Sequence, residues 1–256
     1  DNNLIQISST YTNFIDLNNE ELSSIKSSDL NYCIIRKNQY VYDLISSNRF
    51  KNSNLCPCKP GESESIKQLN FFIHSGGINS YNQARDIPSL ESTSTLSAAL
   101  NLGTISCRSV WNGAQISKKI AIDENQTNSI DTWIKELAWR EFYQNALLNF
   151  PELEKGPYRK KWLYFPWQNR PDWFEAWENG LTGIPIIDAS IRQLKNSGWM
   201  HNRCRMIVAS FLVKDLLIDW KWGENFFMKN LVDGDLASNN GGWQWSASSG
   251  MDPKPM

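Results

Sequence analysis

Four side chains of different chemistry lie along residues 136–143 at the spacing of one helix face. Glu136, Trp139, Arg140 and Tyr143 stand at i, i+3, i+4 and i+7, and residues so spaced share one side of an α-helix. The face would present an acid, a flat ring, a cation and a phenol. A solvated face with a Glu136–Arg140 ion pair is the ordinary alternative, but it leaves the tryptophan unexplained. A site that stacks a nucleobase and holds a phosphate explains all four.

A run of hydroxyl side chains, STSTLS at residues 92–97, precedes a segment rich in alanine and leucine. Hydroxyls in front of a helix commonly cap its free backbone N–H groups. The same position can hold a phosphate, because N–H donors and the helix dipole favour an anion there. The cap is the more frequent use, so the local sequence favours it and leaves the phosphate site open.

The stretch GWMHNRCRM, residues 198–206, carries a second group of polar side chains. Asn202 can hydrogen-bond a base edge or a phosphate, and Arg203 and Arg205 can hold phosphates. The ordinary alternative for Arg203 is a surface salt bridge. We therefore treat this stretch as a candidate nucleic-acid contact that needs structural support.

Two carboxylates flank Gly234 in the sequence LVDGDLAS. Asp233 and Asp235 resemble the start of a calcium loop, but an EF-hand needs more ligands and a closing glutamate. No metal site is predicted. Asp235 could instead hydrogen-bond a ribose or a ring N–H group.

The segment NNGGWQW, residues 239–245, follows directly. On an extended backbone Trp243 and Trp245 would point the same way. Gly241 and Gly242 would let the chain turn sharply or approach another group closely. We expect a flexible segment that brings aromatic rings close to a ligand.

Helical periodicity dominates from about residue 63. The first apolar face is predicted to contain Ile66, Leu69, Phe72 and Ile73. The further expected helices are one that ends at Gly103, one capped by Ser106, one over 130–150 that ends at Pro151, one from Pro185 to Gly198, a buried one over 203–219 and a short one over 223–231. Nothing predicts a multi-stranded sheet, so the expected fold class is all-α. Residues 1–62 are predicted to be an interdomain linker with short helical turns, and residues 63–256 a helical domain.

Composition narrows the function. The 256 residues carry a net charge of −1, two histidines, five cysteines and twelve tryptophans. So few histidines argue against a Ser-His-Asp triad or a histidine metal site, and Cys56 and Cys58 are too closely spaced for a zinc knuckle. The odd, scattered cysteines favour a reducing, cytoplasmic compartment. With no signal peptide and no run of eighteen apolar residues, no membrane contact is expected.

Taken together, these stretches resemble the FAD-binding domain of the DNA photolyase/cryptochrome family. The resemblance rests on TSTLS, WIKELAWREFY, TGIPIIDASIRQLKNSGWMHNRCRMIVASFLVKDLLIDW and DGDLASNNGGWQWSAS, and covers about residues 80–253. It is greatest to microbial class I cyclobutane-pyrimidine-dimer photolyases with a folate antenna. It implies an all-helical domain that holds FAD. It also implies light-driven repair of pyrimidine dimers in DNA by an electron from reduced flavin.

The resemblance also assigns residues. The cofactor would be bound by Tyr81, Thr93, Ser94, Thr95, Leu96, Ser97, Trp133, Asp233, Gly234, Asp235 and Asn239. DNA would be contacted by Arg85, Glu136, Trp139, Arg140, Tyr143, Asn202, Arg203, Met206 and Trp245. Asn239 would lie beside flavin N5, and Glu136 would hydrogen-bond the dimer. Trp243 would lie against the flavin and begin a chain of electron donors that continues through Trp220 and Trp167.

The chain also departs from the family pattern. Thr95 stands where many members carry arginine, which implies a weaker phosphate contact. The α/β antenna domain, expected to bind the folate, and the usual C-terminal continuation are absent, so the sequence is read as a piece of a longer protein. A monomer is expected.

Two other functions stay open. A cryptochrome would share the fold and lack repair, although Asn239, Trp139 and Met206 favour repair. A helical DNA- or RNA-binding domain without cofactor would purify without colour.

Overall fold

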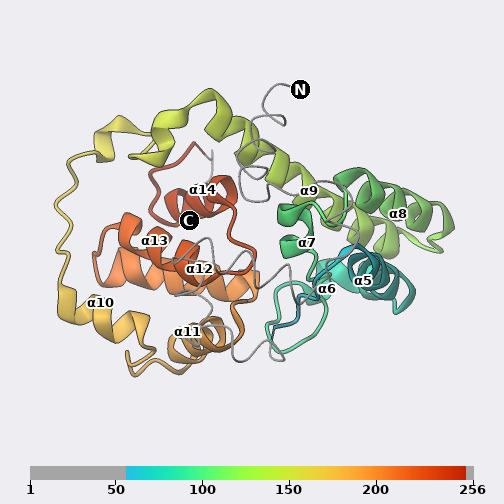
Figure 1. Cartoon of the computed structure of the whole chain (residues 1–256), viewed down its shortest axis with the longest axis horizontal. Helices are drawn as coiled ribbons and strands as arrows, with labels where there is room; N and C mark the ends of the chain where they lie inside the picture. The colour runs from blue at the N-terminus through green and yellow to red at the C-terminus, as the bar shows by residue number, and fades with distance from the viewer. Residues whose placement is uncertain (1–55, 252–256) are drawn as a thin grey trace, which may run out of the picture. The chain divides into compact units, whose positions relative to one another are not determined.

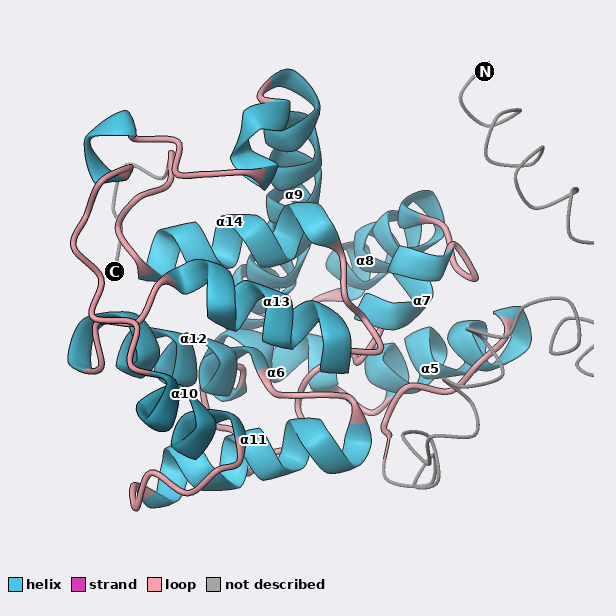
Figure 2. Cartoon of the chain, turned by 60° about the vertical axis from the view of Figure 1, so that its left-hand side comes forward, coloured by secondary structure: helices cyan, strands magenta, loops and turns pink. Residues whose placement is uncertain are grey.

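The structure is a computed structural model that describes residues 56–251, which fall within one compact unit, Asn54–Met256. The predicted linker over residues 1–62 therefore lies almost entirely outside the described residues. Between residues 56 and 251 every regular element is helical (Figure 2), which confirms the all-α fold class.

The elements follow in chain order. The first group comprises α5 (Glu62–His74), α6 (Gly77–Ala84), α7 (Ser97–Leu102), α8 (Cys107–Ile120) and α9 (Glu124–Asn149). The second comprises α10 (Pro171–Glu178), α11 (Pro185–Ser197), α12 (Asn202–Ser210), α13 (Trp220–Asn230) and α14 (Leu236–Ser246). Two 3-10 turns, η2 (Pro151–Glu154) and η3 (Lys160–Trp162), lie between the two groups, and one π-helical turn, η4 (Phe211–Asp215), follows α12 within the second group.

Several helix boundaries follow the predicted signals. Ser106 caps α8 by accepting a hydrogen bond from the backbone N–H of Ser109. Gly103 and Gly198 end α7 and α11 in the left-handed conformation that glycine adopts readily. Pro185 is the first residue of α11, where its missing N–H costs no hydrogen bond.

Other expectations are wrong. The sequence predicts a single helix over 203–219. The α-helix α12 ends at Ser210 and is followed by the π-helical turn η4, which stops at Asp215. The short helix expected over 223–231 begins earlier, at Trp220, because Asp219 caps it through the N–H of Lys221. In α5, Leu69 and Phe72 are buried as predicted, whereas Ile66 is exposed.

Two apolar clusters form the core. One joins α5, α6, α8 and α9 around Phe72, Val110 and Ile130. The other lies among α10–α14 and includes Trp177 and Trp243. The long helix α9 packs against α6 and α8 and also against α14, and in Figure 1 it extends from beside α8 toward α14. This helix therefore connects the two clusters and carries the face that begins at Glu136.

Candidate functional site

A cavity of about 560 Å³ opens between the two groups of helices, and it gathers most of the residues predicted for a site. Its walls come from α6, the segment before α7, α9, α12 and α14. The predicted residues that line it are Tyr81, Arg85, Thr93, Ser94, Thr95, Leu96, Ser97, Trp133, Glu136, Trp139, Arg140, Tyr143, Asn202, Met206, Asp233, Asp235, Asn239, Trp243 and Trp245. Its volume is in the range of small-molecule and cofactor sites.

Four predicted residues do not line this cavity: Trp167, Trp220, Arg203 and Gly234. Trp220 is buried in the same apolar cluster as Trp243. Trp167 is partly buried and packs against that cluster. Arg203 stands next to the cavity, with Nη1 3.6 Å from the sulfur of Met206.

The inner wall of the cavity is held by a buried carboxylate. Asp233 accepts two hydrogen bonds from Nη2 of Arg205, at 3.0 and 2.8 Å, and one from the hydroxyl of Ser97 at 2.6 Å. The phosphate contact suggested for Arg205 is therefore replaced by an internal ion pair. These bonds fix the start of α7 against the segment before α14.

Asp235 has a different partner from Asp233, so the two carboxylates do not converge on one point. It caps α14 by accepting hydrogen bonds from the N–H and the hydroxyl of Ser238, at 3.0 and 2.5 Å. Within residues 56–251 no group of three or more metal-ligating side chains comes together. The capped α14 begins at the cavity wall and carries Asn239 and Trp243 along it.

The hydroxyl run does not cap α7, so the more frequent interpretation of that run is wrong. The residue before the helix is Leu96, and no side chain caps it. The run is held from behind instead, because the amide of Gln68 donates to the carbonyl of Ser94 at 3.2 Å and to the hydroxyl of Thr95 at 2.7 Å. Thr95 takes a positive φ of 50°.

A cysteine supports the same loop. Cys58 Sγ lies 3.7 Å from the carbonyl of Thr95. Burial, together with the neighbouring Cys56, raises the pKa of Cys58 to about 12, so its thiol stays protonated at neutral pH. The loop backbone thus has side-chain partners behind it, while residues 93–97 line the cavity.

The glycine–tryptophan segment is a helix, and the flexible, extended segment expected there is wrong. Gly241 and Gly242 lie inside α14. A Cβ atom on Gly241 would stand 2.1 Å from the ring of Tyr143, so this glycine permits the close approach of α9. A Cβ on Gly242, which lines the cavity, would meet nothing within 4 Å.

Trp243 lies on the cavity side of α14 and is 2% exposed. Its ring packs edge-on to Phe227 and Trp177, with centroids 5.0 and 6.2 Å away. Its indole N–H is buried and has no hydrogen-bond partner among the described residues. An orphaned donor beside a cavity suits a ligand that offers an acceptor.

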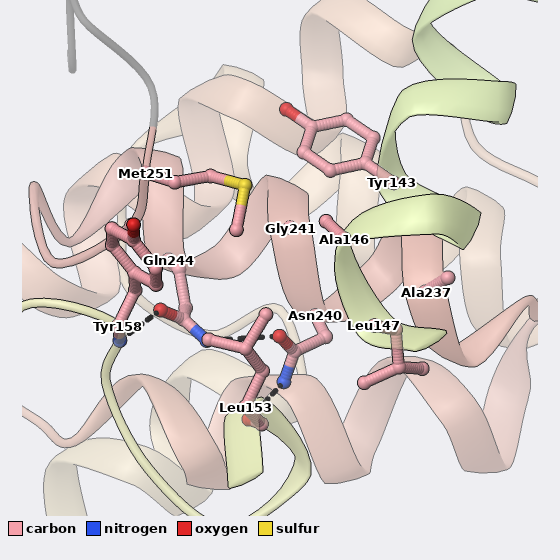
Figure 3. Close-up of a pocket in the computed structure, with 11 residues that line it drawn as sticks. Tyr143, Ala146, Leu147, Leu153, Tyr158, Ala237, Asn240, Gly241, Gln244 and Met251 are labelled. Atoms are coloured by element: carbon pink, nitrogen blue, oxygen red, sulfur yellow. Dashed lines mark hydrogen bonds between the residues drawn. The ribbon is translucent and has the colours of Figure 1, made fainter. Parts of the chain in front are cut away.

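The opposite face of α14 is fixed by a buried polar network, which Figure 3 shows around a small cavity. The Asn240 amide donates to the carbonyl of Leu153 at 2.9 Å, and the Gln244 amide donates to Asn240 Oδ1 at 2.9 Å. Gln244 Oε1 in turn accepts from the N–H of Tyr158 at 2.9 Å. Such satisfied networks rigidify the element that carries them, so α14 presents a fixed face to the large cavity.

Glu224 joins this network, and sequence reasoning missed it. Its buried carboxylate forms an ion pair with Lys221 and accepts from the Asn240 amide at 2.6 Å. Its backbone carbonyl accepts from the Asn239 amide at 3.0 Å, which orients Asn239. The sequence signal that could have indicated this role is the position of Glu224 among the aromatic residues of 220–227.

Charged and aromatic residues form the outer rim. Glu136 accepts from Arg85 at 2.5 Å, so the Glu136–Arg140 pair of the ordinary alternative does not form. Arg140 instead donates to the carbonyl of Leu100 and to Gln144, each at 3.3 Å. Arg85 also lies over the ring of Tyr81, 5.4 Å from its centroid. Burial, with the nearby Glu136 charge, raises the pKa of Tyr81, so the phenol stays neutral.

Trp139 is 45% exposed at this rim, and its ring stacks on Tyr143 with centroids 5.9 Å apart. An indole with one face on a protein ring and much of its surface open can take a second flat ring. The cavity therefore has a buried inner wall and an open, charged and aromatic rim.

Comparisons with known proteins agree with this arrangement. A family model described as the FAD binding domain of DNA photolyase matches residues 133–256. A deoxyribodipyrimidine photo-lyase of Synechococcus sp. is 56% identical over 200 residues, which make up 78% of this chain and 41% of that protein. The chain belongs to the DNA photolyase family.

Further members of the photolyase family show the same extent of similarity. The deoxyribodipyrimidine photo-lyase of Escherichia coli is 48% identical over 195 residues, 76% of this chain and 40% of that protein. The crystal structure of a bacterial class III photolyase from Agrobacterium tumefaciens matches with a TM-score of 0.71 and 45% identity, over 77% of this chain and 40% of that one.

A cryptochrome shares the fold as well. The structure from Synechocystis sp. matches with a TM-score of 0.70 and 31% identity, over 78% of this chain and 41% of that one. The chain thus spans about 40% of the length of the relatives it matches. The residues matched by the photolyase family model begin within α9, so Tyr81 and the hydroxyl run lie before them.

Proposed function

We propose that the protein repairs cyclobutane pyrimidine dimers in DNA with light, as a deoxyribodipyrimidine photo-lyase that uses reduced FAD. The observation that carries this proposal is one cavity of about 560 Å³ that is lined both by residues expected to bind flavin and by residues expected to bind the lesion. The names of the Synechococcus and Escherichia coli relatives support the same reaction.

FAD fits the inner part of the cavity by the chemistry of its walls. Hydroxyls of residues 93–97 suit phosphate oxygens, and the positions of Asn239, Asp235 and Trp243 suit a flat, polar-edged ring. The buried Trp243 N–H has no hydrogen-bond partner among the described residues, and the space beside Gly242 is open, so both suit a ligand seated against this part of α14. When bound, FAD supplies a light-excited electron donor for splitting the cyclobutane ring.

The rim would receive the dimer. The damaged nucleotides must leave the helical stack, and their weakened pairing reduces a cost of a few kcal/mol. Trp139 would stack on a base of the dimer, and Asn202 would hydrogen-bond it. Glu136, already held by Arg85, would present its second carboxylate oxygen to the dimer.

The test is repair of an oligonucleotide that contains one pyrimidine dimer, under near-UV or blue light with a dark control. We expect purified protein to show flavin absorption and to restore the dimer only in light. A flavin that is photoreduced without any repair would favour the cryptochrome function. Purification without flavin would favour a helical nucleic-acid-binding domain.

We further propose that Trp243 is the first donor in the photoreduction of oxidised flavin, followed by Trp220 and Trp167. Its burial against the cavity and its place in one cluster with Trp220 support this order. Trp243→Phe should retain flavin, because a ring replaces a ring, and should slow bleaching of the oxidised flavin in blue light at least tenfold. Equal bleaching rates in both proteins would remove Trp243 as the first donor.

Other properties follow the same resemblance. We infer a folate antenna in the complete protein, action as a monomer on damaged DNA and a cytoplasmic location. Among the described residues, no helix combines the length and hydropathy needed to cross a bilayer. The name of the Saccharomyces cerevisiae relative includes the word mitochondrial, so compartments differ between relatives.

A further inference from the structure

Two arginines at the rim of the cavity share one carboxylate. Arg85 Nε lies 3.6 Å from Asp86 Oδ1, and the guanidinium of Arg203 forms an ion pair with the same oxygen. Arg85 also pairs with Glu136 on α9. The four charged groups thus form a chain, Glu136–Arg85–Asp86–Arg203, that runs from α9 past the end of α6 to α12.

The chain has no net charge, because two guanidiniums face two carboxylates. The hydrogen bond from Arg203 lowers the pKa of Asp86, so its carboxylate is ionised at neutral pH. Arg85 and Arg203 are both expected to contact DNA, whose backbone offers them phosphates, yet in the free protein both already have an anionic partner. A phosphate must therefore either join a neutral cluster or displace a carboxylate.

Asp86 is the carboxylate that a phosphate can displace at the lowest cost. Its side chain is 53% exposed, whereas that of Glu136 is 34% exposed. Exposed ion pairs contribute little free energy, changing an equilibrium by up to about fivefold. A phosphodiester oxygen offers arginine the same geometry as a carboxylate oxygen. The exchange would leave both arginines paired before and after binding.

We propose that Asp86 is an internal competitor at the DNA-binding rim: its carboxylate pairs with Arg85 and Arg203 in the free protein and gives way to a DNA backbone phosphate. This proposal rests on the proposed function, since it takes DNA as the ligand of the rim. The Asp86 carboxylate would compete with the phosphate for the two arginines. This competition would lower DNA affinity and reduce the number of counterions released from DNA on binding. Sequence reasoning assigned no role to Asp86.

The test compares Asp86→Asn with wild type in the flavin-loaded protein, by titration of dimer-containing and undamaged duplexes at several salt concentrations. With the competitor removed, we expect both duplexes to bind about three- to fivefold more tightly. The slope of log K against log salt should become steeper by up to about 0.9, because one more phosphate is neutralised without displacing a carboxylate. Asp86→Glu keeps the charge and should retain the wild-type slope.

Asp172→Asn is the matched control. Asp172 forms an exposed ion pair with Arg170 outside the cavity, so the substitution changes net charge equally and leaves the rim intact. We expect less than a twofold change in affinity and an unchanged slope. The thermal unfolding midpoint of each variant shows that it is folded.

The outcomes separate this proposal from the proposed function. Weaker binding by Asp86→Asn, or the same effect as Asp172→Asn, would overturn the competing role. A wild type that binds both duplexes equally would contradict dimer recognition, while the effect of Asp86 could still be measured on the undamaged duplex. A wild type that binds no DNA would overturn both.

Discussion

The inner wall and the rim of the cavity both pair arginine with aspartate, yet they do so in opposite surroundings. On the inner wall the Asp233 side chain is 2% exposed and accepts two hydrogen bonds from Arg205 Nη2 and one from the hydroxyl of Ser97. At the rim the Asp86 side chain is 53% exposed and shares single contacts with two arginines. A buried pair is costly to break, whereas an exposed pair exchanges its partners cheaply.

The tryptophans repeat this contrast. Trp243 is enclosed between Phe227 and Trp177, while Trp139 stacks on one protein ring and leaves much of its surface open. Both residues line the same cavity. The comparison suggests a fixed inner wall suited to a resident cofactor and an adaptable rim suited to a substrate that arrives and leaves.

The strongest test of the fixed inner wall is Asp233→Ala. The substitution leaves Arg205 partly buried without its anion and removes the acceptor of Ser97, so we expect a loss of about 3 kcal/mol in the free energy of unfolding. Flavin content should fall as well, because the start of α7 loses its hydrogen bond to the segment before α14, which keeps the bond from Asn101 to the carbonyl of Gly234. Denaturant unfolding and the ratio of flavin to protein absorbance measure the two effects.

Asp86→Ala provides the control for that change. It also removes an aspartate that pairs with arginine, but here the carboxylate is exposed. We therefore expect the unfolding free energy to fall by less than about 1 kcal/mol. Equal losses in the two variants would contradict the contrast between wall and rim.

A smaller effect is expected for the two adjacent glycines of α14. Gly241→Ala places a methyl group against the Tyr143 ring and should destabilise the fold by about 2 kcal/mol. Gly242→Ala places it in the cavity and should stabilise the flavin-free protein by up to about 1 kcal/mol through helix propensity.

Flavin affinity gives a second test of the Gly242 position. Gly242→Ala should bind flavin more weakly, because its methyl group occupies space on the cavity wall. Calorimetric unfolding of the apoprotein and fluorescence titration with FAD give the two quantities. Unchanged flavin affinity in Gly242→Ala would argue against a flavin seated on this face of α14.

Local signals in the sequence were sufficient for most of the helix ends. Ser106, Gly103, Pro185 and Gly198 act through their own backbone or through bonds to residues three or four positions away. The fold class and the gathering of the predicted residues around one cavity also agree with the sequence. Whether those residues bind flavin and DNA stays a prediction.

Interactions between distant segments explain the failures. Gly241 and Gly242 suggest a hinge locally, but the Asp235 cap and the bonds of Asn240 and Gln244 to residues 153–158 stabilise a helix there. The hydroxyl run looked like a cap, yet Gln68, some 26 residues earlier, holds its backbone in another conformation. Neither partner is visible in a local window of sequence.

The choice of partner for Glu136 has the same origin. Arg140 stands at the favourable i+4 spacing, but such a pair contributes only about 0.2–0.5 kcal/mol on a helix. The carbonyl of Leu100 competes for Arg140, and Arg85 from α6 reaches Glu136. A weak local preference therefore gives way to tertiary contacts.

The smallest effect on the fold, and a selective effect on binding, is expected for Trp139→Ala. Because Trp139 is 45% exposed, we expect the unfolding free energy to change by less than about 1 kcal/mol and flavin to remain bound. Loss of a stacking surface should weaken binding of dimer-containing DNA by about 1–3 kcal/mol. Trp111→Ala is the matched control, since Trp111 is 47% exposed on α8 and does not line the cavity. We expect it to bind DNA like wild type. Equal DNA affinities in the two variants would exclude stacking at the rim, and loss of flavin from Trp139→Ala would place Trp139 with the fixed inner wall instead.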